Sequence, residues 1–375
     1  MKKKILVMYA RYGSGHKSIA EYVSRYIEDN NNYEVMLFDM TDYANFVGRC
    51  GVRLFDFAYK YCKKGYAIGY KITNYKFMSI GNVSFLKKSY DNKNLRQKIS
   101  EFNPDIVIST HFYCSNIIGV YNDLGLINAK LITIITDYHT HEWWSRNHTQ
   151  QTAFIVGNDI VKQELISRGV PAKKIYPFGI PLNNNKLEEL DSRENILKRY
   201  NLLGNRKIYL FYGGGGTAGS MHYFEYFKTL AKLKINADII FISGRSNELK
   251  KKCENYIKEK NINNIKILGF TTDGLNLMKI SDMVITKPGG AIVTECLEMH
   301  RSMMLIPGIG GQEKHNAKFI ARKKYGIKVN GLWSFKRNIK RLENNPEIII
   351  KMNERLAKLE ENKAVKKIND LIKKM

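Results

Sequence analysis

The sequence predicts an α/β protein whose two Rossmann-like domains face each other across a cleft. The chain has 375 residues, which is enough for two domains of ordinary size. Short apolar runs recur along it, each followed by a polar or glycine-rich turn and then by a helical pattern, as in parallel sheets. A polar run at residues 183–186 separates two groups of such units. We therefore expect domains over residues 1–182 and 190–340 and a C-terminal helix over 341–375.

The composition indicates a globular protein with an anionic partner. Hydrophobic residues make up 44% of the chain and charged residues 26%, which is ordinary for a soluble domain, but the net charge is +26. Such a surplus favours nucleic acid, an acidic membrane surface or phosphorylated substrates as partners. Neither a signal peptide nor a spanning helix is predicted, because no apolar run approaches roughly 20 residues. Five cysteines without a CxxC pair predict free thiols in a cytosolic protein and no metal site.

The chain begins with a buried strand over residues 4–10, a glycine-containing loop over 11–16 and a helix over 17–30. His16 stands where the loop becomes the helix, a position that faces the crevice at the carboxyl end of the strand. A neutral histidine there could take a proton from a hydroxyl group. The alternative is a histidine that only caps the helix or packs locally.

After a second strand over residues 33–40, the pattern changes to a basic and aromatic segment. Between Tyr43 and Lys98 there are twelve Lys or Arg residues, twelve aromatic residues and only two acidic residues, Asp56 and Asp91. Basic heads with interleaved Tyr and Phe suit the boundary of an anionic bilayer. The same composition suits single-stranded nucleic acid, or a pair of amphipathic helices with an aromatic core and a solvated lysine face. The composition leaves all three alternatives open.

Two further strands, over residues 106–110 and 131–136, end in polar residues. His111 follows the first, and Asp137, His141 and Trp144 follow the second. The histidine spacing of this second cluster does not fit a helical metal pair, so a polar acceptor or sugar-binding patch beside an aromatic platform is the better prediction. Since the carboxyl ends of parallel strands share one edge, we expect these residues and His16 to converge on one rim.

The second group of strand–turn–helix repeats contains three turns that could bind an anion or a sugar. A strand over residues 207–212 leads into Gly213, Gly214, Gly215 and Gly216, a loop that lacks the GK[ST] of an NTPase and so does not predict ATP hydrolysis. The further helices and strands of both groups are predicted at residues 153–158, 159–168, 194–200, 223–232, 237–245, 265–270 and 274–280.

The second of these turns, Lys287-Pro288-Gly289-Gly290, joins a strand over residues 283–286 to a helix over 291–299. A glycine turn before a helix N-terminus binds phosphate, Lys287 adds positive charge, and Glu295 could bind a vicinal diol, so a nucleotide is indicated. The alternative is an ordinary turn. The third turn follows a strand over residues 302–307, and its Gln312 and Glu313 could bind hydroxyl groups.

These motifs, in this order, resemble the diacylglycerol glycosyltransferases of glycosyltransferase family 28, which include bacterial processive diacylglycerol β-glucosyltransferases and plastid monogalactosyldiacylglycerol synthases. The resemblance covers roughly residues 4–330. Lys-Pro-Gly-Gly…Thr-Glu and Gly-Gln-Glu…Asn are typical of family 28, and Thr-Asp-Tyr…His…Trp is typical of the diacylglycerol branch. The chain departs at Phe112, where the family usually has proline, and at Ala291, where it usually has isoleucine or leucine.

The resemblance implies a GT-B fold and inverting transfer from a UDP-sugar, with no metal and no other cofactor. It implies His16 and Asp137 as the catalytic residues, Glu295 on the ribose, and Gln312 with Glu313 on the sugar. The implied donor-binding residues are Gly213, Gly214, Gly215, Gly216, Lys287, Gly289, Gly290, Thr294, Glu295, Gln312, Glu313 and Asn316. The implied acceptor-binding residues are Gly15, His111, His141 and Trp144.

The expected function is transfer of glucose or galactose from a UDP-sugar to diacylglycerol by a peripheral enzyme on the cytoplasmic side of the cell membrane. Its expected partners are UDP-glucose or UDP-galactose, diacylglycerol and an anionic membrane surface that residues 43–98 contact, and no nucleic acid. The enzymatic alternatives are transfer of N-acetylglucosamine to a polyprenyl-linked acceptor and epimerisation of a UDP-sugar. The non-enzymatic alternative is a basic nucleic-acid-binding protein.

Overall fold

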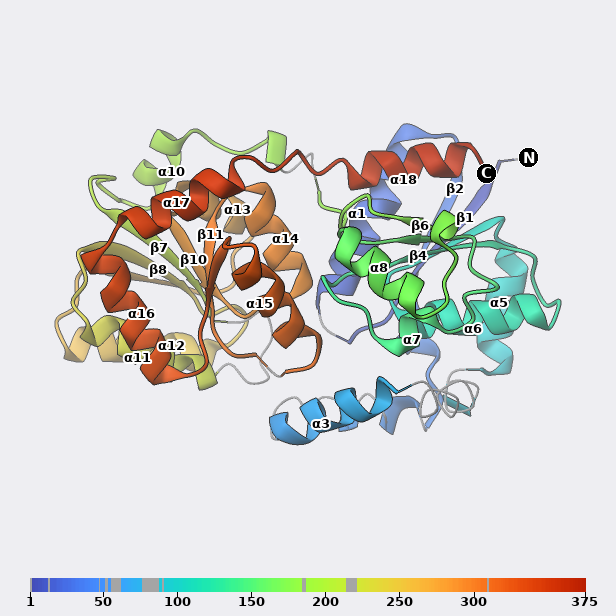
Figure 1. The fold of residues 1–375 in the computed structure, drawn as a ribbon, viewed down its shortest axis with the longest axis horizontal. Coiled ribbons are helices and arrows are strands. Elements are labelled where there is room, and N and C mark those ends of the chain that lie inside the picture. The colour runs from blue at the N-terminus through green and yellow to red at the C-terminus, as the bar shows by residue number, and fades with distance from the viewer. Residues whose placement is uncertain are drawn as a thin grey trace. The chain divides into compact units, whose positions relative to one another are not determined.

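A computed structural model of the protein divides into two units, each built around one parallel β-sheet (Figure 1). Unit 1 contains the N-terminal part of the chain up to Asn183 together with Asn362–Met375, and unit 2 contains the chain from Asn184 to Glu361. The structure describes residues 2–12, 14–46, 48–50, 53–54, 62–75, 88–89, 91–183, 187–213, 221–308 and 310–375. Among these residues, no helix combines the length and the apolar character needed to cross a bilayer.

Unit 1 alternates strands and helices, as its apolar runs predict. Its strands are β1 (Lys4–Tyr9), β2 (Glu34–Asp39), β3 (Ile106–Ser109), β4 (Lys130–Ile134), β5 (Ala153–Ile155) and β6 (Ile175–Tyr176). Its helices are α1 (Ser14–Asn30), η1 (Met40–Tyr43), α3 (Lys63–Thr73), α5 (Lys93–Phe102), α6 (Phe112–Asp123), α7 (Glu142–Ser145), α8 (Asp159–Ser167), η2 (Ala172–Lys174) and α18 (Ala364–Lys373).

The six strands of unit 1 form a sheet in the order β2-β1-β3-β4-β5-β6, with parallel pairing throughout. The order reverses between β1 and β3, since β2 lies on one side of β1 and the later strands lie on the other. Ligands of open parallel sheets bind at such a switch point, outside the carboxyl ends of the strands. His16 follows β1 and His111 follows β3, so both residues flank this point.

Unit 2 repeats the same alternation. Its strands are β7 (Lys207–Tyr212), β8 (Ala237–Ile242), β9 (Ile265–Leu268), β10 (Met283–Thr286), β11 (Ser302–Leu305) and β12 (Gly326–Lys328). Its helices are α10 (Arg193–Arg199), α11 (Met221–Lys232), α12 (Asn247–Glu259), α13 (Gly274–Ile280), α14 (Gly290–Glu298), α15 (Gln312–Arg322), α16 (Leu332–Asn344) and α17 (Glu347–Leu356). Strand β12 and its Gly326 were not predicted, because three residues are too few to show a strand pattern.

The strands of unit 2 form a second parallel sheet in the order β12-β11-β10-β7-β8-β9. Here the order reverses between β7 and β10. The turn at Gly213 follows β7 and the Lys287–Gly290 turn follows β10, so two predicted donor turns flank the second switch point. The buried strand residues Tyr209, Phe211 and Phe241 pack with residues of α11 and α16 in one apolar core.

The C-terminal residues differ from the single helix expected over 341–375. The structure has the end of α16, then α17, then α18. Helix α16 ends before Pro346, because proline disfavours helical backbone in the residue that precedes it, and Asn345 accordingly leaves the helical region with φ −137° and ψ 71°. Helix α18 packs on α1 of unit 1 (Figure 1), where Asn31 donates a 2.8 Å hydrogen bond to Asn369.

Candidate functional site

His16 lies in the first turn of α1, and its ring is held by two other strand ends. Its Nδ1 is 2.6 Å from the backbone carbonyl oxygen of Thr110 and 3.2 Å from the hydroxyl of Thr136. A carbonyl oxygen can only accept a hydrogen bond, so Nδ1 carries the ring proton. The other nitrogen, Nε2, therefore holds the lone pair that a general base needs.

The surroundings of His16 keep it neutral. Its ring centroid lies 4.7 Å from that of His111, with the two rings nearly perpendicular. Burial lowers the pKa of His16 to about 4, although the hydrogen bond to the Thr110 carbonyl acts in the opposite direction. Burial also lowers the pKa of His111 well below its usual value, and His16 adds to that effect. Both rings are thus uncharged near neutral pH.

Asp137 lies at the same edge of the sheet. It follows Thr136 after the end of β4 and is half-buried. Burial raises the pKa of Tyr70 on α3, and the charge of Asp137 raises it further, which places this carboxylate near the Tyr70 phenol. The predicted convergence of the ends of β1, β3 and β4 is confirmed by the contacts of His16 with Thr110 and Thr136. Thr136 is part of the Thr-Asp-Tyr motif, but neither threonine was predicted to hold the ring of His16.

His111 and Trp144 are buried and have structural contacts, and the acceptor contacts predicted for them stay predictions. His111 is 2% exposed, and its Nδ1 accepts a 3.2 Å hydrogen bond from the Tyr113 amide as the N-cap of α6. Phe112 then occupies the first helical position, where the family's usual proline also fits. Trp144 is 4% exposed and packs in an apolar cluster with Ile135 and Phe154. Gly15 contributes only backbone, beside His16 in α1.

His141 binds the end of α3 to the body of unit 1. Its Nδ1 accepts from the Trp143 amide, and its Nε2 lies 3.0 Å from the Tyr70 carbonyl oxygen, to which it donates. Next to it, the Asn74 side-chain oxygen accepts from the Glu142 amide at 2.9 Å and from Arg168 at 3.2 Å. His141 therefore positions α3, and its contact with an acceptor stays a prediction.

Arg168 is expected to be needed for this docking of α3. Its guanidinium is 2.6 Å from a Glu142 carboxylate oxygen, and the side chain of Glu142 is only 10% exposed. In the Arg168→Ala variant this buried carboxylate loses its ion pair and Asn74 loses a donor, so α3 should detach more often. Hydrogen exchange of residues 62–75 should become several-fold faster than in the wild type. Lys252→Ala, which breaks an exposed pair with Glu248, is the matched control, and unchanged exchange in Arg168→Ala would refute the docking role.

In unit 2, the turn after β10 leads directly into the N-terminus of α14. Gly289 is the N-cap residue and makes no side-chain cap, so the first turn of this nine-residue helix has no capping side chain. Free N–H groups and the helix dipole make such an end suitable for an anion. Glu295 is half-buried near the middle of α14, and its charge raises the pKa of Tyr212, after the larger effect of burial. Tyr212 ends β7 and was not predicted as part of the site.

Three of the side chains predicted to bind the donor make hydrogen bonds at or beside this turn, and their contact with a donor stays a prediction. Glu313 is 5% exposed and accepts a 2.7 Å hydrogen bond from Lys287 Nζ. Asn316 is fully buried and donates to the Pro288 carbonyl oxygen at 3.0 Å. Thr294 is 2% exposed and donates to the Gly290 carbonyl oxygen within α14. Gln312, the first residue of α15, is half-buried at the same edge of the sheet.

Gly213 has a packing role, since an added Cβ would lie 2.7 Å from the ring of Phe241 and 3.0 Å from the Ile242 carbonyl oxygen. Its predicted contact with a diphosphate stays a prediction. Gly214, Gly215 and Gly216 lie outside the described residues.

Gly308 is expected to be indispensable for the Lys287–Glu313 pair. A Cβ on Gly308 would lie 1.7 Å from Glu313 Oε2, and Glu313 cannot move aside without leaving Lys287. Gly308→Ala should therefore lower the free energy of unfolding by about 1–3 kcal/mol, the usual range for overpacking. Gly331→Ala is the control in the same unit, because its Cβ would meet no atom within 4 Å. Equal unfolding midpoints in urea for the two variants would contradict this account.

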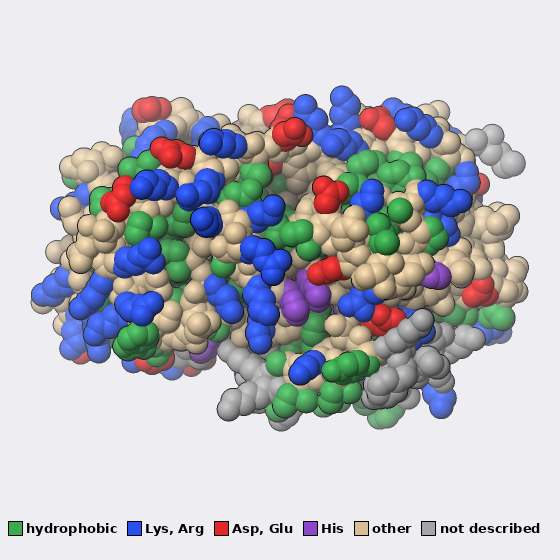
Figure 2. Space-filling model, in the orientation of Figure 1, with side chains coloured by type: hydrophobic (Ala, Val, Ile, Leu, Met, Phe, Trp, Pro, Cys, Tyr) green, Lys and Arg blue, Asp and Glu red, His purple; other side chains and the backbone are tan. Residues whose placement is uncertain are grey.

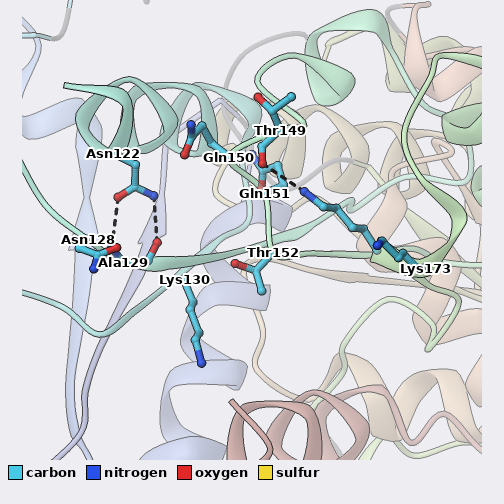
Figure 3. Close-up of a pocket in the computed structure, with 10 residues that line it drawn as sticks. Asn122, Asn128, Ala129, Lys130, Thr149, Gln150, Gln151, Thr152 and Lys173 are labelled. Atoms are coloured by element: carbon cyan, nitrogen blue, oxygen red, sulfur yellow. Dashed lines mark hydrogen bonds between the residues drawn. The ribbon is translucent and has the colours of Figure 1, made fainter. Parts of the chain in front are cut away.

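A separate depression lies at the opposite edge of the sheet of unit 1 (Figure 3). It is lined by residues at the amino ends of β4, β5 and β6, among them Lys130, Thr152 and Lys173. Lys174 beside it donates to the carbonyl oxygens of His148 and Thr149 at 3.2 and 3.1 Å. The depression is therefore not part of the site around His16, which lies at the carboxyl ends of the strands.

Comparison with known proteins matches two parts of the chain to family models. Residues 16–182 match the model of monogalactosyldiacylglycerol (MGDG) synthase, and residues 213–375 match the glycosyltransferase family 28 C-terminal domain. A processive diacylglycerol beta-glucosyltransferase of Staphylococcus epidermidis is 28% identical over 334 residues, which are 86% of this chain and 80% of the relative. One of Bacillus cereus (strain AH187) is 25% identical over 327 residues, 85% of this chain and 80% of the relative.

Solved structures share the fold over the full length of the chain. Acinetobacter baumannii MurG has a TM-score of 0.67 and 15% identity and covers all of both chains. UDP-GlcNAc 2-epimerase from Neisseria meningitidis has a TM-score of 0.65 and 14% identity, over 99% of this chain and all of that one. The predicted fold, two Rossmann-like domains of the GT-B type, is thus confirmed. The chain thus joins a region that matches the monogalactosyldiacylglycerol synthase family, over residues 16–182, to a region that matches the glycosyltransferase family 28 C-terminal domain, over residues 213–375.

Proposed function

We propose that this protein transfers a hexose from a UDP-sugar to the hydroxyl of diacylglycerol and inverts the anomeric centre. The observation that carries the proposal is the neutral His16, with its Nε2 lone pair, at the switch point of a domain that matches MGDG synthase. The curated relatives, which are named diacylglycerol beta-glucosyltransferases, support the same acceptor.

In the proposed reaction, Nε2 of His16 takes the proton of the acceptor hydroxyl while that oxygen attacks the anomeric carbon of the sugar. The bond from this carbon to the diphosphate breaks at the same time, and UDP leaves with the bonding electrons. The N-terminus of α14 stabilises the charge that develops on the diphosphate. Glu295 accepts hydrogen bonds from the ribose hydroxyls, and Asp137, next to Thr136 in the sequence, is the carboxylate that would stabilise the imidazolium that forms.

The sugar is tested by a donor panel, with glucose as the first candidate because the relatives are named glucosyltransferases. UDP release is measured with UDP-glucose, UDP-galactose and UDP-N-acetylglucosamine, each with and without diacylglycerol in anionic vesicles. Acceptor-dependent release with UDP-glucose or UDP-galactose supports the proposal. Release with none of the three donors would refute it. UDP should also raise the thermal midpoint, since a ligand that binds only the native state stabilises it.

We propose that the enzyme reaches its acceptor as a peripheral membrane protein, with residues 43–98 on the bilayer. In α3, the residues that dock on the site are Tyr70, Thr73 and Asn74. The side chains that remain exposed include Ile68 at 59% and Ile72 at 44%. An apolar outer face with basic neighbours suits the boundary of an anionic bilayer, and the net charge of +26 acts in the same direction.

The rate of turnover should not fall as the pH drops through 6.5, where an ordinary histidine gains a proton. Because burial lowers the pKa of His16 to about 4, its base form persists as pH falls from 8 to 5. A rate that fell by half near pH 6.5, with an unchanged circular dichroism spectrum, would contradict His16 as a buried base. The same shift means that the unfolded chain binds a proton below pH 6.5 that the native chain does not, so this group lowers stability as pH falls toward 4.

A further inference from the structure

A second strongly basic stretch lies in unit 2, apart from the segment over residues 43–98. Between Glu313 and Glu343 the sequence has ten Lys or Arg residues and no Asp or Glu. The ten are Lys314, Lys318, Arg322, Lys323, Lys324, Lys328, Lys336, Arg337, Lys340 and Arg341. A block of this size with one sign of charge creates a local positive potential over α15, β12 and α16.

Within this stretch, α16 begins with two exposed apolar side chains. Trp333 is 72% exposed and Leu332 is 39% exposed, whereas Phe335 and Ile339 on the inner face of the helix are fully buried. The guanidinium of Arg337, one turn further along, lies 5.0 Å from the centroid of the Trp333 ring. The core is therefore formed without Trp333, and its ring is left in water beside a cation.

Several basic side chains surround this end of α16. Strand β12 ends at Lys328, only four residues before Leu332. Burial lowers the pKa of Lys328, and the positive charges of Lys318 and Lys314 lower it further, so these three ammonium groups lie close together. Figure 2 shows Lys and Arg side chains gathered around α16, with an apolar patch beside them.

The start of α16 lies at the carboxyl edge of the sheet of unit 2. Because β10, β11 and β12 are parallel neighbours, the start of α16 lies at the same edge of the sheet as the turns that begin α14 and α15. A surface bound there would lie on the side of unit 2 that carries the predicted donor turns.

We propose that the α16 tip, defined as Leu332, Trp333, Lys336 and Arg337 with the neighbouring Lys314, Lys318 and Lys328, binds the interface of an anionic lipid bilayer. Trp prefers the headgroup boundary, Leu332 adds apolar area, and each basic residue near an anionic surface strengthens the attraction. Single-stranded nucleic acid is less favoured, because it needs a series of aromatic platforms and this tip presents one exposed aromatic ring, that of Trp333. The inference deepens the proposed function by giving unit 2 its own bilayer contact.

The test is binding of the full chain to phosphatidylglycerol–phosphatidylcholine vesicles by sedimentation, with pure phosphatidylcholine vesicles for comparison. Arg337→Gln should lower the partition coefficient on anionic vesicles about fivefold, the effect of one charge near such a surface. Trp333→Ala should lower it by roughly the same factor, because the ring no longer leaves water. Trp333 should also report binding directly, since the other two tryptophans are half-buried Trp143 and buried Trp144. Its fluorescence should be quenched by brominated lipid, and Trp333→Phe should remove that quenching.

Leu203→Ala is the matched control, because Leu203 is 85% exposed in the same unit but precedes β7, at the amino edge of the sheet. Wild-type partitioning of both tip variants, or an equal loss in Leu203→Ala, would overturn the inference. The inference would also be overturned if the tip variants lost binding to an oligonucleotide but kept wild-type binding to vesicles. Thermal stabilisation by UDP should be unchanged in both tip variants, which shows that the fold is intact. Vesicle binding is measured without a sugar donor, so failure of the proposed transfer reaction and failure of this inference give different results.

Discussion

The His16→Ala variant is expected to lose hexosyl transfer almost completely, with kcat lower by about 10²–10⁴, the usual contribution of a general base. The structure supplies the reason, because the Thr110 carbonyl fixes the proton on Nδ1 and leaves Nε2 to accept one. The effect should appear in kcat, since no predicted donor contact involves this residue. The stabilisation of the variant by UDP in a thermal melt should equal that of the wild type.

A matched control for this variant is His148→Ala. His148 also belongs to unit 1 but lies in the segment before β5, at the opposite edge of the sheet. It should keep the turnover of the wild type. If His16→Ala retained more than half of the wild-type kcat, His16 could not be the base, and Asp137 would become the candidate.

The Lys287→Ala variant is expected to lose about 3 kcal/mol of stability, the lower end of the range for breaking a buried ion pair. Glu313 has a side chain that is only 6% exposed, and it would lose the ammonium group 2.7 Å away. Lys287 itself is 26% exposed, so part of its charge is already screened by water. The change should also weaken binding of a UDP-sugar, because the pair links the turn after β10 to the start of α15.

The double variant Lys287→Met/Glu313→Gln separates the two effects. With neither charge present, no buried carboxylate lacks the ammonium group of residue 287, so urea unfolding should recover most of the lost free energy. UDP-sugar binding should remain weaker than in the wild type if the ammonium group acts on the donor. A double variant that is less stable than Lys287→Ala would show that loss of the ion pair does not explain the loss of stability.

The architecture could be predicted from the sequence because each strand is a short apolar run followed by a turn. The runs at Lys4–Tyr9 and Met283–Thr286 show this clearly. Every residue of the first strand after Lys4 is buried, and so is every residue of the second. The sequence does not show the strand order, which depends on pairing between distant segments. The return of α18 to unit 1 was missed for the same reason, because its contact with Asn31 joins residues more than 300 positions apart.

The candidate site could be predicted in part. His16 was identifiable because it stands at a loop-to-helix boundary after a strand, but the threonines that orient it, Thr110 and Thr136, follow the ends of β3 and β4, far away in the sequence. The acceptor contacts predicted for His141 and Trp144 stay predictions, and the sequence did not show that His141 caps α7 and binds α3 or that Trp144 packs in the core. A cluster of polar and aromatic residues after a strand has the same sequence pattern whether its side chains face a ligand or pack inside the protein. The burial of each side chain distinguishes the two, and burial is seen only in the structure.

The identity of the lipid product tests most directly whether a hexose moves from a UDP-sugar to diacylglycerol with inversion. The wild-type chain would be incubated with UDP-α-glucose, or UDP-α-galactose if the donor panel favours it, and diacylglycerol in anionic vesicles. The extracted lipid would be analysed by mass spectrometry and by the anomeric proton coupling in NMR. The account predicts a β-hexosyl diacylglycerol that is absent with His16→Ala. An α-linked product, or UDP release without any glycolipid, would contradict it.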